Sequence, residues 1–219
     1  MTSCSQILRS VILACCSLGL FAALPAGAET AASSRPTKRI VIFGDSITAG
    51  YGIDNEAAFP ALLQTKIDAA ALPYSVINAG LSGETSAGGL RRIQWILRQP
   101  LDVFVLELGG NDALRGQDLL ATEKNLTAII AAVKQRFPQA KIVVAGMQVP
   151  PNLGREYTNQ FREMFPRVAR ENDALLVPFL LEGVGGQTHL NQPDGIHPTL
   201  QGHQLIAETL WKLLQPLLN

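Results

Sequence analysis

Cysteine is scarce in this chain and confined to its beginning. All three cysteines, Cys4, Cys15 and Cys16, lie among the first 28 residues. If those residues are removed, the rest of the chain can form no disulfide, no cysteine nucleophile and no thiolate metal site. Its stability must then come from a packed core. The remaining length, about 190 residues, is ample for one core and short for two domains.

A net charge is lacking as well. Lys and Arg together number 18, as do Asp and Glu, so the formal net charge is zero. Removal of Arg9 with the first 28 residues leaves 18 − 1 = 17 basic residues against 18 acidic ones. A chain without a strong field of one sign does not attract nucleic acid or an anionic membrane surface over a long range. We therefore expect a small or neutral partner, no nucleic acid and a monomeric chain.

The chain has no apolar run long enough for a typical membrane span. The longest, Val11–Leu24, is shorter than the roughly 20 residues that a span needs. It follows the basic Arg9 and precedes the small residues Ala26-Gly27-Ala28, which is the pattern of a secretory signal peptide. We expect residues 1–28 to be that signal peptide, with export to the periplasm or the medium and no stable membrane anchor. Residues 29–38 then form a linker, and 39–219 a single domain.

Apolar, β-branched runs alternate with segments of helical spacing through the rest of the chain. The expected strands are Arg39–Phe43, Tyr74–Asn78, Val103–Leu108, Lys141–Ala145 and Ala174–Phe179. The expected helices are Phe59–Ala70, Ala87–Arg98, Asp118–Phe137, Glu156–Asn172 and Leu200–Leu214. Strands that are apolar on both faces and separated by helices favour a parallel sheet covered on both sides. The pattern predicts an α/β fold, a three-layer sandwich around a five-stranded parallel sheet.

Polar and glycine-rich clusters follow these strands at one end only. They are Gly44-Asp45-Ser46, Asn78–Thr85, Gly109–Asp112, Gly146–Pro151 and Asp194–Pro198. The carboxyl ends of parallel strands meet at one edge of a sheet, where ligands of such folds bind. The segregation therefore predicts a functional site at that edge.

The first cluster presents a serine at the end of a buried strand. A serine on a tight strand-to-helix turn exposes its Oγ and has backbone N–H groups beside it, which is how a nucleophile is mounted. The alternative is an ordinary turn in which Ser46 caps the following helix, since serine is a favoured N-cap residue. The motif alone leaves both interpretations open.

A serine nucleophile needs a base, and the chain has three histidines. His189 and His203 fit surface or helix-start positions. His197 follows Asp194 by three residues, so one loop could supply both an imidazole and the carboxylate that orients it. The alternative for this pair is a helix-entry turn in which Asp194 caps the turn and His197 is solvated.

Donors for an oxyanion are also available at the strand ends. The Ser46 N–H, the Gly83 N–H and the Asn111 side-chain amide could hold a developing negative charge. Taken singly, Gly83 fits a plain turn and Asn111 a helix start. Asp45 and Asp112 lack a base partner in sequence, and we expect them to make structural hydrogen bonds. The histidine spacings match no zinc pattern and no phosphate-binding loop is present, so we expect neither a metal nor a cofactor.

The four blocks occur in the order Gly44-Asp45-Ser46, Gly83, Gly109-Gly110-Asn111-Asp112 and Asp194-x-x-His197. This arrangement resembles the SGNH hydrolases, also called the GDSL lipase/esterase family, over essentially the whole chain after the leader. Residues 106–116 and 147–157 are most similar to the branch of secreted bacterial arylesterases and multifunctional thioesterase/lysophospholipases. Ile47 stands where the family name has leucine. The turn is not the Gly-x-Ser-x-Gly of the larger α/β-hydrolases, because Ile47-Thr48-Ala49-Gly50 follows the serine.

The resemblance implies a flavodoxin-like sheet and an esterase. It makes Ser46 the nucleophile, His197 the base and Asp194 its orienting carboxylate, with oxyanion donors from Ser46, Gly83 and Asn111. The stiff, apolar Val149 and Pro150 are candidates for the wall of an acyl pocket. Such an enzyme would cleave esters and thioesters of small-molecule substrates that carry an acyl chain. Two alternatives remain: an esterase that removes O-acetyl groups from carbohydrate, and a binding module without catalysis.

Overall fold

The computed structural model describes residues 38–219. The expected signal peptide and residues 29–37 of the expected linker lie outside the described residues, and Lys38 already belongs to the first strand. Within the described range no helix is long and apolar enough to cross a membrane.

Five parallel strands form one sheet in the order β2-β1-β3-β4-β5. Their bounds are Lys38–Gly44 (β1), Tyr74–Gly80 (β2), Val103–Glu107 (β3), Lys141–Ala145 (β4) and Leu175–Val177 (β5). The three inner strands are almost wholly buried, which explains why their sequences show continuous apolar runs instead of alternation. The expected five-stranded parallel sheet is confirmed.

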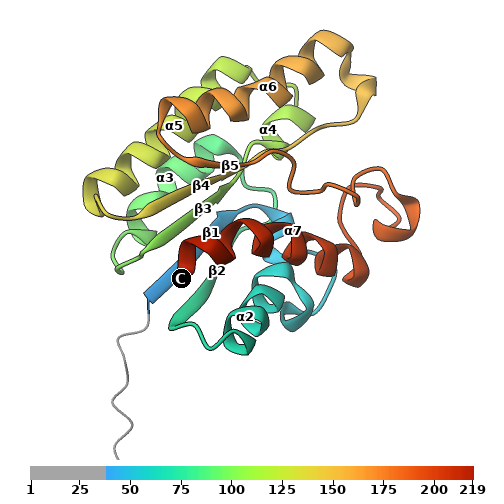
Figure 1. Cartoon of the computed structure of the whole chain (residues 1–219). Coiled ribbons are helices and arrows are strands. Elements are labelled where there is room, and N and C mark those ends of the chain that lie inside the picture. The colour runs from blue at the N-terminus through green and yellow to red at the C-terminus, as the bar shows by residue number, and fades with distance from the viewer. Residues whose placement is uncertain (1–37) are drawn as a thin grey trace, which may run out of the picture. The chain divides into compact units, whose positions relative to one another are not determined.

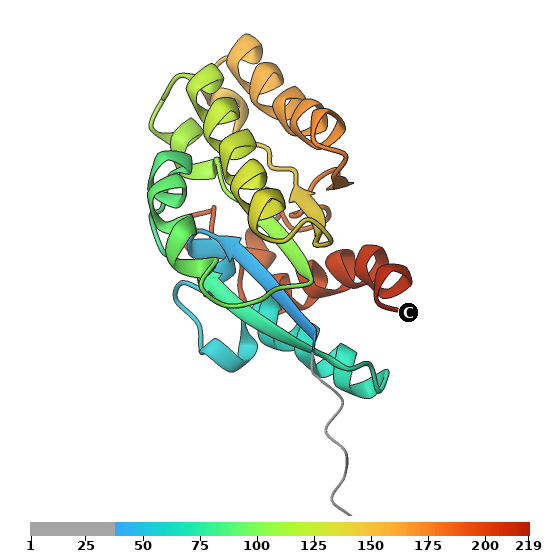
Figure 2. The same cartoon turned by 90° about the vertical axis from the view of Figure 1, so that its left-hand side faces the viewer.

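Helices cover both faces of this sheet (Figure 1). One layer consists of α2 (Phe59–Ala69) and α7 (Leu200–Leu218), which pack against each other. The other consists of α3 (Ser86–Ile96), α5 (Leu119–Arg136) and α6 (Arg155–Glu171), in which α5 contacts both neighbours. The view in Figure 2 shows α3 and α5 on the outer side of the strands, away from α7. The three-layer sandwich is therefore as expected.

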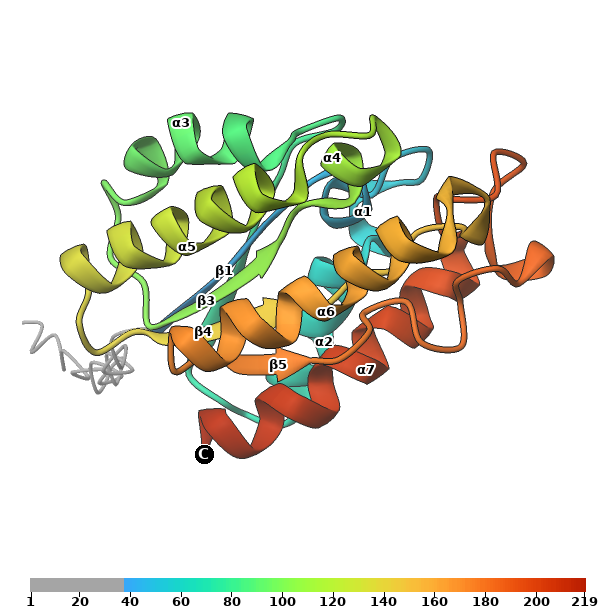
Figure 3. The ribbon, with the colours of Figure 1, turned by 90° about the horizontal axis from the view of Figure 1, so that it is seen from above.

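Short helical segments occupy the connections between these elements. Two follow inner strands directly: α1 (Ser46–Ala49) after β1 and α4 (Gly110–Leu114) after β3. Three 3-10 turns complete the chain: η1 (Asn55–Ala57), η2 (Pro151–Leu153) and η3 (Thr188–Leu190). Viewed from above, α1 and α4 lie near each other at the same end of the sheet (Figure 3).

Most element boundaries fall within one or two residues of the expected ones; β5 ends two residues early, and only the end of α7 departs further. Strand β5 stops at Val177 because Pro178, which follows, has no N–H to donate to a ladder. Helix α7 continues past Pro216 to Leu218, beyond the expected end at Leu214. Leu214 and Leu218 are both buried one turn apart, and this packing outweighs the hydrogen bond that Pro216 cannot make.

Candidate active site

The loop after β1 places Ser46 at the first position of α1. Asp45, and not Ser46, is the cap of this helix: its Oδ1 accepts the Ile47 N–H at 3.0 Å. The interpretation of Ser46 as a helix cap is therefore wrong. Gly44 is required here, since a Cβ on it would lie 2.1 Å from the Thr48 Oγ1. The Ser46 hydroxyl is therefore not used as a helix cap and lies at the carboxyl edge of the sheet.

Ser46, His197 and Asp194 form a continuous hydrogen-bonded series. The His197 Nε2 lies 2.8 Å from the Ser46 Oγ, although 151 residues separate the two in sequence. The His197 Nδ1 lies 2.7 Å from the Asp194 Oδ2. The structure thus brings together the three residues that the sequence nominated, with the His197 ring between Ser46 and Asp194.

The turn that carries Asp194 also keeps its carboxylate ionised. Desolvation by burial acts to raise its pKa, but the backbone N–H groups of His197 and Ile196 and the His197 ring outweigh it, so that the pKa of Asp194 falls to about 2. Both N–H groups donate to the Asp194 Oδ1 at 3.0 Å, which leaves Oδ2 for the imidazole. A negative charge is therefore fixed beside the His197 Nδ1, where it selects the tautomer with a basic Nε2.

Two residues that sequence reasoning missed hold His197 from the other side. The Tyr51 ring lies 4.6 Å from the His197 ring, centroid to centroid, at 40°. Gln192 connects the two segments, because its side-chain amide donates to the Tyr51 carbonyl at 2.7 Å and its N–H donates to the His197 carbonyl at 2.7 Å. The only available signal was the place of Tyr51 just after the serine turn.

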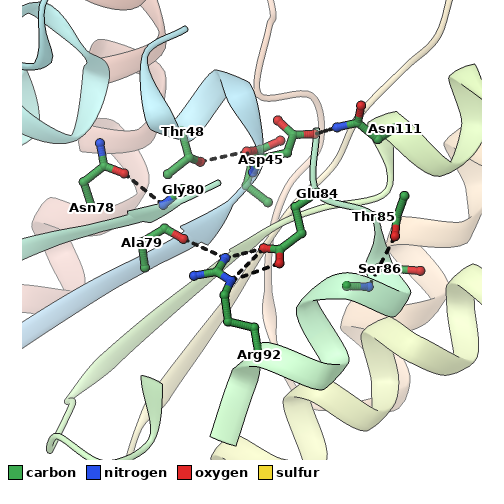
Figure 4. Close-up of polar contacts among 12 residues, drawn as sticks. Asp45, Thr48, Asn78, Ala79, Gly80, Glu84, Thr85, Ser86, Arg92 and Asn111 are labelled. Carbon is green, nitrogen blue, oxygen red and sulfur yellow. Dashed lines mark hydrogen bonds and ion pairs between the residues drawn. The ribbon is translucent and has the colours of Figure 1, made fainter. Parts of the chain in front are cut away.

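The expected oxyanion donors lie in three segments: Ser46 follows β1, Gly83 follows β2 and Asn111 follows β3. Asn111 stands in α4, and its Nδ2 donates one hydrogen to the Asp45 Oδ2 at 3.0 Å, which leaves the second hydrogen of the amide (Figure 4). Gly83 has a φ of +79° in the turn closed by the Glu84 N–H and the Leu81 carbonyl, 3.0 Å apart. Within residues 38–219 neither the Ser46 N–H nor the Gly83 N–H has a hydrogen-bond acceptor.

An ion pair behind the turn fixes the Gly83 segment. The Arg92 guanidinium donates to both carboxylate oxygens of Glu84 and to the Ala79 carbonyl (Figure 4). It also lies 4.2 Å from the centroid of the Phe43 ring. Glu84 is nearly buried. Arg92 therefore joins the end of β2 to the residue after Gly83, a role that its helical position in the sequence gave no reason to expect.

A cavity of about 360 Å³ opens beside the serine. Ser46, Asn111 and His197 line it, together with Val149 and Pro150, the two residues expected in an acyl pocket. Further apolar lining residues were not anticipated: Ile47, Leu114, Met147, Phe179, Leu181 and Ile196. Gly83 and Asp194 are not among the lining residues. The cavity wall is mainly apolar and suits a hydrocarbon chain.

The other singled-out residues have structural contacts. Asp112 accepts hydrogen bonds from the Ser86 N–H at 2.8 Å and from the Ser86 and Thr122 hydroxyls, and thereby joins α4 to α3 and α5.

His189 is exposed, as expected. His203 lies in the first turn of α7 but not at the surface: it is 1% exposed and its Nδ1 accepts the Phe59 N–H at 3.2 Å. The apolar interface between α2 and α7 buries it. Among residues 38–219 no group of three or more His, Asp or Glu side chains is placed to hold a metal ion.

Comparisons with known proteins agree with this geometry. The chain is 42% identical to the esterase TesA of Pseudomonas aeruginosa over 180 residues, which covers 82% of this chain and 89% of that protein. It is 41% identical to thioesterase 1/protease 1/lysophospholipase L1 of Escherichia coli strain K12 over 181 residues, or 82% and 85% of the two chains. Its structure matches that of the psychrotrophic esterase EstA from Pseudoalteromonas sp., inhibited by monoethylphosphonate, with a TM-score of 0.78 and 33% identity over 83% and 99% of the chains.

A family model provides the assignment. It matches residues 42–205, a range that includes Ser46, Gly83, Asn111, Asp194 and His197. With this match and with relatives above 40% identity over most of both chains, the protein belongs to the GDSL-like lipase/acylhydrolase family.

Proposed function

We propose that the chain is an exported serine esterase that hydrolyses carboxylic esters and thioesters through an acyl-enzyme on Ser46. Its membership of the family makes it an ester-bond hydrolase, and its likeness to an esterase and to a thioesterase/lysophospholipase supports both bond types. The observation that carries the mechanism is the 2.8 Å contact between the Ser46 Oγ and the His197 Nε2, with Asp194 behind the ring. A binding module would not need this series, so the non-catalytic alternative is dropped.

The first half of the reaction forms the acyl-enzyme. His197 removes the Ser46 proton as Oγ attacks the acyl carbonyl, and Asp194 stabilises the resulting imidazolium. The carbonyl oxygen becomes an oxyanion, which the free N–H groups of Ser46 and Gly83 and the second hydrogen of the Asn111 amide would hold. Loss of one such donor typically costs ~3 kcal/mol in the transition state. His197 then gives its proton to the leaving alcohol or thiol.

The second half releases the acyl group. Water enters in place of the leaving group, His197 takes a proton from it, and the hydroxide attacks the acyl carbon. The same three donors hold the second oxyanion, and its collapse frees the acid and returns the proton to Ser46. The apolar cavity beside Ser46 would hold the acyl chain through both halves.

A carbohydrate O-acetyl esterase is the remaining alternative function. An acetyl group would fill only a small part of a cavity of about 360 Å³, and the mainly apolar wall offers few hydrogen-bond partners for sugar hydroxyls. A series of p-nitrophenyl esters from acetate to long chains, measured beside an acetylated sugar, one acyl-CoA and one lysophospholipid, separates the two. We expect kcat/KM to rise with chain length beyond acetate. Activity confined to acetyl esters and acetylated sugar would support the alternative.

A variant of the cavity wall makes the test specific. We expect Val149→Trp to lower kcat/KM for long-chain esters at least about 10-fold while sparing the acetate, since even one methylene in an apolar pocket discriminates at this level and the indole is much larger. Leu175→Trp is the matched control, because Leu175 is exposed on β5 and does not line the cavity. An equal loss for all chain lengths would contradict the acyl pocket.

Export and the monomeric state complete the proposal. Arg9, the apolar run Val11–Leu24 and Ala26-Gly27-Ala28 support cleavage after residue 28. N-terminal sequencing of the exported protein should give Glu29 as its first residue, and a mature protein that retains Met1 would refute the leader. Light scattering of the purified protein should give the mass of one chain.

A further inference from the structure

We propose that Glu107 is a positioning residue: it carries a proton, donates it to Asp45, and through Asp45 holds the Asn111 amide at the oxyanion site. The proposal rests on the function proposed above and adds a residue that none of the four sequence blocks contains. Glu107 is the last residue of β3 and pairs with Gly44 across the sheet, directly beneath the serine turn.

The Glu107 side chain is fully buried, and only one of its two carboxyl oxygens has hydrogen-bond partners among the described residues. Oε2 accepts the Asp45 N–H at 3.1 Å and the Thr48 hydroxyl at 2.7 Å. Oε1 is buried and has no hydrogen-bond partner within residues 38–219. In the same range no ion pair involves Glu107. An ionised carboxylate in this position would be a buried charge without a counter-ion, which is a costly arrangement.

The neighbouring carboxyl group resolves this conflict. The carboxyl group of Asp45 is the neighbour of Glu107, and two carboxyl groups can hydrogen-bond to each other only if one of them carries a proton. Thr48 and Asp45 are the polar groups that face Glu107, whereas Asn111, the Ile47 N–H and His197 face Asp45. Burial raises the pKa of Asp45 to about 6, while the hydrogen bonds from Ile47 and Asn111 and the charge of His197 act in the opposite direction and favour its ionised form. The proton therefore belongs on Glu107, whose Oε1 lacks any other partner among the described residues. Burial likewise raises the pKa of Glu107 well above its ordinary value, and the charge of Asp45 raises it further.

Asp45 passes this constraint to the oxyanion site. Its Oδ1 is engaged by the Ile47 N–H and its Oδ2 by the Asn111 Nδ2, both at 3.0 Å. With Glu107 bound to both its N–H and its carboxylate, Asp45 cannot turn without breaking these bonds. One hydrogen of the Asn111 amide is thereby fixed on Asp45, and the other is aimed away from it. A displaced donor stabilises the transition state less and leaves the acyl cavity intact. Substitution of Glu107 should therefore affect kcat and not KM.

Substitution of Glu107 tests directly whether its side chain donates a hydrogen bond to Asp45. Glu107→Gln replaces the acid by an amide that still donates to Asp45 and still accepts from Thr48, and we expect kcat within about 3-fold of the original because these bonds are kept. Glu107→Leu can neither donate to Asp45 nor accept from Thr48. We expect its kcat to fall at least about 10-fold with KM unchanged, as for a misplaced catalytic group. Glu123→Gln, in the Arg167 ion pair between α5 and α6, is the matched control.

Two further measurements separate positioning from a general loss of structure. Glu107→Leu and Asn111→Ala should be non-additive in kcat, because the first is argued to act through the second. Infrared spectra should show a C=O band of a protonated carboxylic acid that Glu107→Gln removes, which keeps the proposal testable if the Leu variant does not fold. A loss in Glu107→Gln of more than about 10-fold, full additivity, or no such band would overturn it. None of these results bears on Ser46, whose failure as nucleophile would appear as an active Ser46→Ala.

Discussion

At the scale of single residues, the site depends on a carboxylate that stays charged in a half-exposed position. The Asp194 side chain is 39% exposed, yet two backbone N–H groups and the His197 ring hold its pKa at about 2. A carboxylate with a lowered pKa contributes its stabilisation above its ordinary pKa of 3.8, and this is lost as the pH falls through about 2. Between pH 4 and 7 the charge beside His197 is therefore constant.

This constancy gives a prediction for the pH profile. Asp194→Asn removes the charge and favours the wrong imidazole tautomer, so we expect kcat to fall by a factor on the order of 10² to 10⁴. Any acid limb of kcat/KM between pH 4 and 7 should persist in the variant, because Asp194 does not titrate there. Measurement of kcat/KM against pH for both proteins checks this. Disappearance of the limb in Asp194→Asn, with no limb at lower pH in its place, would show that Asp194 itself titrates in that range.

At the scale of elements, the segment between β2 and α3 is held by side chains and not by regular structure. Arg92 reaches from α3 to the Ala79 carbonyl and to both oxygens of Glu84, and so encloses the turn that carries Gly83. Arg115 adds a hydrogen bond from its Nη2 to the Gly83 carbonyl at 3.1 Å. The turn that carries Gly83 is thus held by the ion pair between Arg92 and the adjacent Glu84 and by the hydrogen bond from Arg115.

The effect of the Glu84–Arg92 ion pair on kcat can be compared with that of a second ion pair in the same protein. We expect Glu84→Gln to lower kcat about 10-fold or more, because the turn is released and an oxyanion donor is displaced. Glu123→Gln breaks the comparable pair with Arg167 between α5 and α6, and should leave kcat unchanged. Thermal unfolding of both variants shows whether each remains folded. Equal effects of the two substitutions on kcat would mean that the Glu84 pair serves stability alone.

The elements also show how far the sequence could predict this protein. Apolar runs gave the five strands, and helical spacing gave the five long helices, because both are local patterns. The candidate site residues could be expected to lie close together because each lies in a loop that follows a strand, and parallel strands bring these loops together at one edge of the sheet. The sequence could not predict the roles of three further residues, Glu107, Arg92 and Gln192. Their hydrogen-bond partners lie 62, 8 and 141 residues away in sequence, and only the packed fold shows these contacts.

At the scale of the whole molecule, a buried histidine connects the two helices of one layer. The His203 Nδ1 accepts the Phe59 N–H, and the two rings stack with centroids 6.1 Å apart. Burial lowers the pKa of His203 from 6.5 to about 4, and the charge of His197 acts in the same direction. Between these two values the unfolded chain binds more protons at this position than the folded one, so the stability of the protein falls as the pH drops from 6.5 to about 4.

This sign leads to a prediction about thermal unfolding. His203→Leu leaves the Phe59 N–H without its acceptor, and we expect a loss of about 1–3 kcal/mol at pH 7.5. The variant cannot bind the proton, so its disadvantage should shrink as the pH falls towards 4. Unfolding midpoints of both proteins across this range give the answer. A constant difference at all pH values would show that His203 does not titrate between its folded and unfolded values.

The molecule as a whole is arranged to present one serine, and labelling of that serine is the most direct test of the account. A fluorophosphonate reacts only with an activated hydroxyl, so the intact mass should increase by one adduct per chain and peptide mapping should place it on Ser46. Ser46→Ala should take up no label and should lose ester hydrolysis by several orders of magnitude, while its unfolding midpoint stays close to that of the original protein. An adduct on another residue, or an unlabelled Ser46→Ala that still hydrolyses p-nitrophenyl acetate at the original rate, would contradict the assignment of Ser46 as the nucleophile.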